Sequence, residues 1–280
     1  MLEFFNVLAS QAFLQNAVVV GLLASLACGV MGTYVVVRKI VFISGGIAHT
    51  VLGGMGIAYY YGWNPLHGAV VAALVAAVII GLISLRYHQY EDTIIGALWA
   101  IGMATGILFI YKTPGYNVDL MTYLFGNILM VSQQSIHLLV GLDAVIILSV
   151  AVFYRPFLAV CFDEEYSRLQ GLHVVSIYLF LLCLIALTVV ILIQVVGIIL
   201  VVALLTLPAA TARHYARSLA QMMAMACLLG AGFTVCGLVA SYTPDLPAGA
   251  TIVLIAGAVY LIVTVFKGLL TRLGVKRPAS

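Results

Sequence analysis

The chain has 280 residues, of which 65% are hydrophobic and only 8% are charged. A water-soluble fold carries charge on about a quarter of its residues, and a disordered chain is poor in apolar residues, so both classes are excluded. The net charge of +3 supplies no dense basic face of the kind that binds nucleic acid. The composition predicts an integral membrane protein that lies in a lipid bilayer.

Long stretches without Lys, Arg, Asp or Glu predict membrane-spanning helices, because about 20 apolar residues cross a bilayer. The stretches do not alternate apolar and polar residues as barrel strands do. We therefore expect an all-α, polytopic helical bundle of about eight or nine transmembrane helices, forming one transmembrane domain over residues 1–280. The expected spans are residues 14–37, 43–61, 66–85, 93–111, 133–154, 174–193, 196–212, 219–241 and 248–266.

Two further segments and one turn complete this arrangement. Residues 1–13 are too short to cross the bilayer and mildly amphipathic, which predicts an interfacial helix. Residues 119–132 are apolar but short, which is typical of a re-entrant or interfacial helix on the outer side. The polar Gln194 and the nearby Gly197 leave room only for a very tight turn between two spans. A helix broken at Pro208 would instead reduce the count to eight.

Basic residues gather on one side of this arrangement, because all of them except Lys112 fall in the same set of loops. Such an excess marks the cytoplasmic side of a membrane protein. We expect a multi-pass protein of the cell (plasma or inner) membrane, with its C-terminal tail, residues 268–280, in the cytoplasm and its N-terminus outside. The gathered residues are Arg38, Lys39, Arg86, Arg155, Arg168, Arg213, Arg217, Lys267, Arg272, Lys276 and Arg277.

His49 lies in the second expected span, and helical spacing puts it on one face with Gly45, Gly53 and Gly56. An ionisable side chain inside a membrane helix faces a neighbouring helix or a water-filled path rather than lipid. Glycines beside it allow another helix, or a second copy of this one, to approach closely. Neutral imidazole is a good ligand for zinc, manganese or iron. Two interpretations stay open: a pathway residue, or a structural histidine bonded to Ser or Thr on a neighbouring helix.

Asp143 is the one acid expected deep in the membrane, in the middle of the fifth span. We interpret it first as a structural hydrogen-bonding residue of the bundle interior and second as a pathway residue. The sequence has no phosphate-binding glycine loop, no HExxH and no Ser/His/Asp signature. It is therefore not predicted to be an enzyme, and ATP hydrolysis is not expected in it.

A short charged helix is predicted in the loop between the fifth and sixth spans. Asp163 can cap it, and Glu164 and Glu165 fall in its first turn, where the helix dipole favours acids. Arg168 is the i, i+4 partner of Glu164, and Gly171 suits the end of the helix. So short a helix is not stable alone, which favours docking onto a partner over an ordinary solvated loop.

Six segments follow one another in an order found in a known family. They are residues 32–38 (GTYVVVR), 44–54 (SGGIAHTVLGG), 91–96 (EDTIIG), 119–129 (DLMTYLFGNIL), the loop that ends in Gly171-Leu172, and 203–212 (ALLTLPAATA). In these segments, and over nearly its whole length, the chain resembles the permease subunit of ABC importers for zinc, manganese or iron ions.

This resemblance implies a set of partners and a mechanism. The permease forms a homodimer, or pairs with a second permease, and the translocation path runs between the protomers. Two cytoplasmic ABC ATPase subunits and an extracytoplasmic metal-binding protein complete the transporter. Residues 163–171 are similar to the family's coupling helix, which fits a cleft in the ATPase and drives alternating access. The metal ion is transported cargo, and no permanently bound cofactor is implied.

One departure from the family bears on the metal. Many members carry an Asp four residues before the membrane histidine, and this chain has Gly45 there. Only His49 therefore transfers as a pathway residue, and two copies of it across a dimer leave coordination to be completed by water or other residues. Without the carboxylate, imidazole favours zinc slightly over manganese or iron.

Two alternatives to this hypothesis remain. One is a permease for a metal chelate or a cobalamin-like compound, whose relatives have more spans and whose wider path would not need His49. The other is an ion-coupled secondary transporter or channel, which would need no ATPase. Such a protein is expected to place several acids in the membrane, and only Asp143 is placed there.

Overall fold

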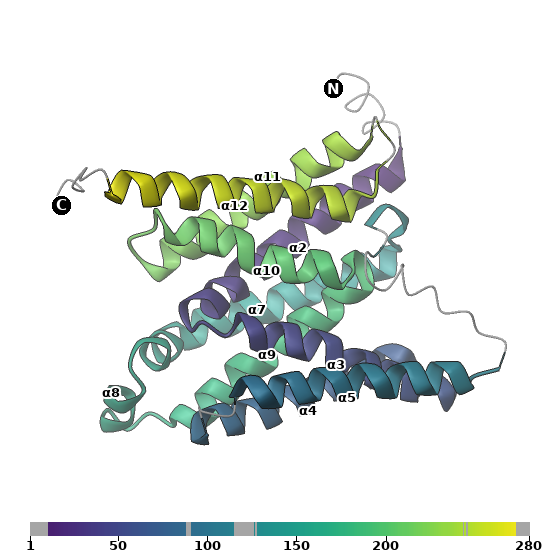
Figure 1. Cartoon of the computed structure of the whole chain (residues 1–280), viewed down its shortest axis with the longest axis horizontal. Coiled ribbons are helices and arrows are strands. Elements are labelled where there is room, and N and C mark those ends of the chain that lie inside the picture. The colour runs from purple at the N-terminus through teal and green to yellow at the C-terminus, as the bar shows by residue number, and fades with distance from the viewer. Residues whose placement is uncertain are drawn as a thin grey trace.

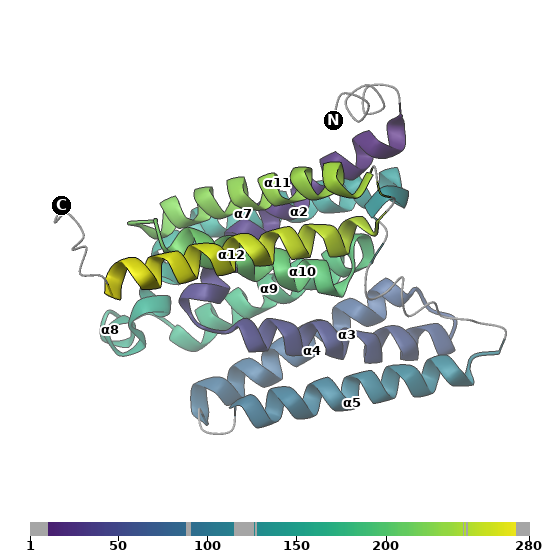
Figure 2. The same cartoon turned by 45° about the horizontal axis from the view of Figure 1, so that its top comes forward.

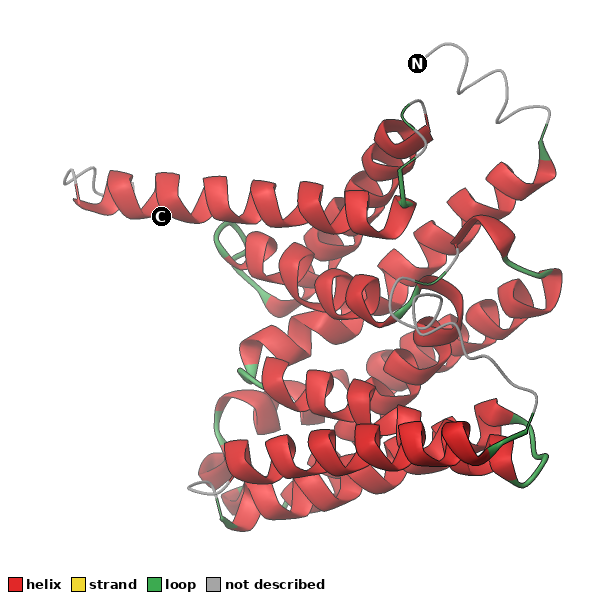
Figure 3. Ribbon diagram, turned by 45° about the vertical axis from the view of Figure 1, so that its right-hand side comes forward, coloured by secondary structure: helices red, strands yellow, loops and turns green. Residues whose placement is uncertain are grey.

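The computed structural model describes residues 11–87, 91–114, 126, 128–242, 244 and 246–272, and these ranges form helices and no strand (Figures 1 and 3). Eight of the described helices are long and apolar enough to cross a membrane. They are α2 (Ala12–Val37), α3 (Val41–Tyr60), α4 (Pro65–Arg86), α5 (Glu91–Lys112), α7 (Gln133–Phe162), α9 (Val174–Val196), α11 (Leu219–Tyr242) and α12 (Ala248–Arg272). The predicted all-α membrane bundle is confirmed.

The segment expected as a further span is α10 (Ile198–Arg213), an apolar helix of 16 residues with Pro208 inside it. A single residue, Gly197, separates it from α9. The backbone of Gly197 has φ 80° and ψ 161°, a conformation that is essentially restricted to glycine. Its N–H donates to the carbonyl of Ile193 at 3.0 Å, which closes α9. The tight turn predicted at this glycine is confirmed.

Capping residues mark where two other helices begin, and a proline lies beside the bend in one of them. Asn64 caps α4 by accepting from the N–H of Leu66, with Pro65 in the first turn, where its missing N–H costs nothing. Ser132 caps α7 by accepting from the N–H of Ser135. Near its far end α7 is kinked, with non-helical backbone at Phe153 and a proline three residues later.

Helices α3, α4 and α5 form a group on one side of the bundle, and the remaining long helices lie together on the other (Figure 2). Glycines allow the close approaches within this group. A Cβ added to Gly53 would lie 2.8 Å from the carbonyl oxygen of Gly102 on α5, and one on Gly56 would lie 2.6 Å from that of Gly106. On the other side of α3, a Cβ on Gly54 would collide with the backbone of α4.

The helix ends next to arginine residues lie together at one end of the bundle. The C-terminal ends of α2, α4 and α10, next to Arg38, Arg86 and Arg213, lie at the same end of the bundle as the short helix α8 (Glu164–Leu169) and the C-terminal end of α12 (Figure 1). We call this end the basic face. The end of α5 with Lys112 lies at the opposite end, as the loop pattern predicts.

Three expectations fall wholly or partly outside the described residues. These are the interfacial helix at residues 1–13, described only from Gln11; the segment 119–132, described at residue 126 and from Ile128; and the tail, described to Arg272. In that second segment Ile128–Met130 form a single turn of 3-10 helix, η2. At the start of the tail, α12 continues to Arg272, past the end of the span expected at residues 248–266.

Candidate functional site: a histidine surface on α3 and a charged helix on the basic face

His49 lies on α3 and stacks against an aromatic ring of α5. Its imidazole is parallel to the indole of Trp99, with ring centroids 4.0 Å apart and an interplanar angle of 8°. Trp99 also packs against Phe42, and its Nε1 donates to the sulfur of Met103 at 3.1 Å. Among the described residues no Ser or Thr is hydrogen-bonded to His49. The stacking holds the ring in place while leaving it half-buried.

Gly45, one turn before His49, borders open space: a Cβ built there meets nothing within 4 Å. Gly53 and Gly56, by contrast, lie in the contact with α5 described above. Of the three glycines that share a face with His49, two are explained by helix packing. The surface around His49 is thus bordered on one side by the α3–α5 contact and on the other by the free space at Gly45.

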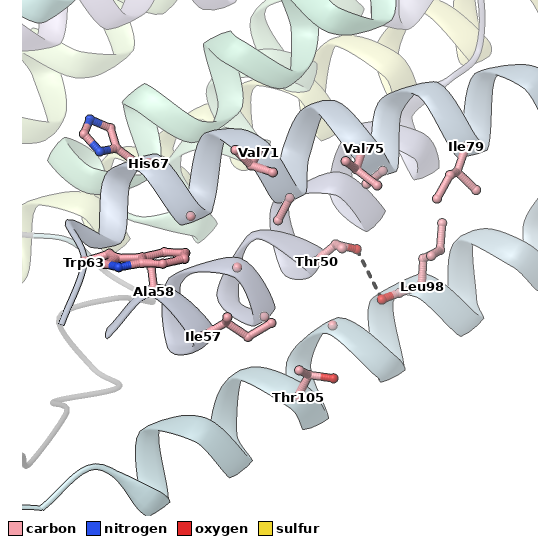
Figure 4. Close-up of a pocket in the computed structure, with 16 residues that line it drawn as sticks. Thr50, Ile57, Ala58, Trp63, His67, Val71, Val75, Ile79, Leu98 and Thr105 are labelled. Atoms are coloured by element: carbon pink, nitrogen blue, oxygen red, sulfur yellow. Dashed lines mark hydrogen bonds between the residues drawn. The ribbon is translucent and has the colours of Figure 1, made fainter. Parts of the chain in front are cut away.

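A cavity of about 580 Å³ lies between α3, α4 and α5, beside the next residue along α3, Thr50 (Figure 4). The hydroxyl of Thr50 donates to the carbonyls of Gly46 at 2.8 Å and Leu98 at 3.2 Å. The other walls are mostly Gly, Ala, Val and Ile, with Trp63 and His67 at one end. His49 does not line this cavity, and an almost wholly apolar wall offers a metal ion no set of ligands. We do not assign the pathway to it.

Asp143 lies on α7 with 5% of its surface exposed, so the prediction of a deep acid agrees with its position. Neither carboxylate oxygen has a hydrogen-bond partner among the described residues. The hydrogen-bonding role expected of it therefore stays a prediction. Across the described residues no three His, Cys, Asp or Glu side chains come together as a metal site, so Asp143 does not join His49 in one.

The predicted short helix is α8, and its ends follow the sequence signals. The Asp163 side chain accepts from the N–H of Tyr166 at 2.9 Å, Glu164 and Glu165 occupy the first turn, and Gly171 ends the segment with φ 79°. Glu165, Arg168 and Gly171 are exposed.

One expectation about α8 is wrong. Glu164 forms its ion pair with Arg38, at the end of α2, and not with Arg168. The i, i+4 spacing permits the local pair, but an exposed arginine offers Glu164 little, whereas Arg38 is partly buried beside it. Burial by itself would lower the pKa of Arg38, and the bond to Glu164 outweighs it and raises that pKa above its ordinary value.

Large apolar side chains stand exposed beside the charges of this region. Leu169, at the end of α8, is 87% exposed, and Phe162 and Tyr166 are exposed as well. Exposed apolar groups rimmed by charge are typical of a surface that binds another protein. The docking helix was predicted from the charges of this loop alone. These three apolar side chains did not enter that prediction, although each stands in the loop sequence.

Known proteins resemble this chain over most of its length. The pattern of the ABC 3 transport family matches residues 10–267. An uncharacterized membrane protein of Synechocystis sp. is 49% identical over 91% of this chain and 91% of its own length. The manganese transport system membrane protein MntC of Halalkalibacterium halodurans is 35% identical, over 96% and 93%. The solved structure of PsaBC from Streptococcus pneumoniae in complex with Fab superposes with a TM-score of 0.83, at 34% identity over 93% of this chain and 94% of that one.

Proposed function

This chain belongs to the ABC 3 transport family, and on that premise we propose that it is the permease subunit of an ATP-driven importer of divalent transition-metal ions. One observation carries the choice of cargo: His49 presents an imidazole on a membrane helix without a Ser or Thr partner among the described residues. Neutral imidazole suits zinc, manganese and iron. The name of the Halalkalibacterium relative, a manganese transport protein, supports a metal ion as cargo.

Two observations favour different metals. The nitrogen donor of His49, with Gly45 where a carboxylate would favour a harder ion, supports zinc. The name of the relative supports manganese. We propose zinc from the donor atoms of this chain, with manganese as the competing cargo in every uptake measurement.

The proposed transporter has two copies of this chain, two ATPase subunits on the basic face and a metal-binding protein on the opposite side. His49, Trp99 and Gly45 are only half-buried in the single chain, and a Cβ at Gly45 meets nothing within 4 Å, which leaves room for a second copy and a path between the copies. The exposed charges and apolar side chains of α8 and its flanks support this helix as the contact with the ATPase. Closure of the ATPase would then drive alternating access.

The basic face is proposed to be cytoplasmic, because basic residues at the helix ends mark that side of a membrane protein. Arg38, Arg86 and Arg213 all end helices there. The same assignment puts α8 where an ATP-hydrolysing subunit can reach it, so charge pattern and function agree on one orientation in the cell membrane.

Uptake of radiolabelled zinc and manganese tests the proposal, in vesicles that hold the chain with its ATPase and metal-binding protein. We expect His49→Ala to lower uptake by about tenfold or more, as loss of a metal-positioning group does. The matched control is His137→Ala on α7, where the histidine is exposed and its Nδ1 contacts the carbonyl of Gln133 at 2.8 Å; its uptake should match wild type.

Two results would contradict the proposal. Equal uptake by His49→Ala and wild type would make His49 a structural residue. Uptake that continues in vesicles without any ATPase would exclude an ATP-driven importer.

A further inference from the structure

Arg38 lies where three parts of the basic face meet: the end of α2, the coupling region α8 and the start of α9. We propose that Arg38 is the positioning residue that joins movement of α8 to α3, the helix that carries His49. This inference rests on the proposed function and adds to it a specific link between the ATPase contact and the metal path.

The first contact of Arg38 is the ion pair with Glu164, the first residue of α8. Nη2 of Arg38 donates to Oε1 of Glu164, and the two side chains are 17% and 21% exposed. An ion pair on an open surface contributes little to stability. One removed this far from water is screened less, and separating it would leave two partly desolvated charges. The two residues, 126 positions apart in the chain, are thus held together more firmly than a surface pair.

The second contact holds the other side of the same segment. The guanidinium carbon of Arg38 lies 4.9 Å from the centre of the Tyr178 ring, in the first turns of α9. Tyr178 is almost fully buried, and a guanidinium over such a ring is attracted to its face. Glu164 precedes the loop at Gly171 and Tyr178 follows it, so Arg38 contacts α8 and the helix that continues from it.

The connection from Arg38 to α3 is short and has little freedom. Lys39 adopts φ 61°, and Lys39 and Ile40 donate their N–H groups back to the carbonyls of Val36 and Val35 at 3.3 and 3.0 Å. Ile40 is buried, and α3 begins at the next residue. A displacement of Arg38 therefore shifts the start of α3 and is not absorbed by a loose loop.

His49 lies about two turns into α3. The chain of contacts runs from α8 through Glu164 to Arg38, through a closed turn to the start of α3, and along a rigid helix to His49. On the other side, Arg38 continues α2, whose Tyr34 packs edge-to-face on Phe157 of α7 at 5.6 Å between ring centroids. The kinked end of α7 leads directly into α8. The helices before and after α8 therefore both contact the C-terminal end of α2.

The experiment measures metal ions moved per ATP hydrolysed, in proteoliposomes that contain the permease, its ATPase and the metal-binding protein. We expect Arg38→Glu and Glu164→Arg each to lower this ratio about tenfold. Arg38 lies outside α8, so in the Arg38→Glu variant ATP hydrolysis and co-purification of the ATPase should change little. The double variant R38E/E164R restores the pair with its charges exchanged, and its ratio should return to within about threefold of wild type, since the effects of directly contacting residues are not additive.

Arg86→Gln is the matched control. Arg86 also ends a helix on the basic face and also lies over a tyrosine ring, Tyr87, at 6.0 Å, but among the described residues it forms no ion pair with α8. Its ratio should equal that of wild type. If Arg38→Glu does not fold, Arg38→Lys decides the matter. It keeps the charge, loses the planar fork that stacks on Tyr178, and should give an intermediate ratio.

Several outcomes would overturn the link. They are a double variant no better than the poorer single variant, a wild-type ratio in Arg38→Lys, and a fall in Arg86→Gln as large as in Arg38→Glu. Loss of the ATPase from the purified Arg38→Glu complex would make Arg38 a docking residue instead. Failure of the proposed function is distinguishable, because in that case the wild-type chain itself moves no metal when ATP is hydrolysed.

Discussion

Gly45 and His49 show how one helix turn could set the choice of metal. The open space at Gly45 means that a side chain can be added there without displacing a neighbour. On a helix, residues four apart lie on one face, so a carboxylate at residue 45 would stand beside the imidazole. At the scale of single residues, the proposed preference for zinc therefore rests on an absent side chain as much as on a present one.

We expect Gly45→Asp to fold and to shift the ratio of manganese to zinc uptake upward by about tenfold, since one added oxygen ligand need change relative binding by only about 1.4 kcal/mol. Competition between the two radiolabelled ions in one vesicle preparation measures the shift. Gly45→Asn, which adds similar volume without the charge, is the control and should shift it less. An unchanged ratio in Gly45→Asp would remove residue 45 from the metal path.

Single residues also show which features of the site can be predicted from the sequence and which cannot. The position of His49 in a span follows from the uncharged stretch around it, and the cap at Asp163 follows from neighbouring residues. The stacking of His49 on Trp99 and the pairing of Glu164 with Arg38 depend on how α3 meets α5 and how α2 meets α8. Those registers arise from packing between segments distant in sequence, and no local pattern encodes them.

Among the elements, the pair α9 and α10 depends most on one backbone conformation. The two helices are separated only by Gly197, and their apolar residues reach the core up to the turn itself: Val196 and Ile198 are both almost fully buried. The sequence predicts this turn because Gln194 and Gly197 interrupt an otherwise continuous apolar run. The span expected at residues 196–212 begins two residues before α10 and ends one residue before it does.

We expect Gly197→Ala to destabilise the protein by about 1–3 kcal/mol, because a side chain at φ 80° and ψ 161° is strained whatever the surrounding space. Thermal unfolding of the detergent-solubilised protein measures the loss. Gly141→Ala is the control, since Gly141 is helical in α7 and an added Cβ there meets nothing within 4 Å. Equal melting temperatures for the two variants would show that the turn at Gly197 can relax.

For the whole molecule, the separation of charge between the two ends of the bundle is the feature with the broadest consequences. The count of basic residues in loops predicts it from sequence, and the helix ends in Figure 1 agree. What composition could not reveal is which helices face lipid or a second copy. In the structure few residues in the most apolar stretches of α5 and α12 are buried within the chain, although α5 is as apolar as the largely buried α2.

Labelling of single cysteines tests the proposed orientation. In a background without the native cysteines, we expect a membrane-impermeant maleimide on intact cells to label Tyr61→Cys, between α3 and α4, and not Arg217→Cys, between α10 and α11. Both positions are exposed, and permeabilised cells should label both. The charge rule predicts this order, and labelling of residue 217 alone in intact cells would reverse the orientation.

The stacking of His49 on Trp99 has an optical consequence. The chain has two tryptophans, Trp63 and Trp99, so Trp63→Phe leaves one indole, whose ring centroid lies 4.0 Å from that of the imidazole. The emission of that indole should change when His49 binds a cation, because the charge then sits against the excited ring. Titration of the Trp63→Phe protein with zinc or manganese would thus report on the path from within, without any attached dye, and His49→Ala in the same background should abolish the response.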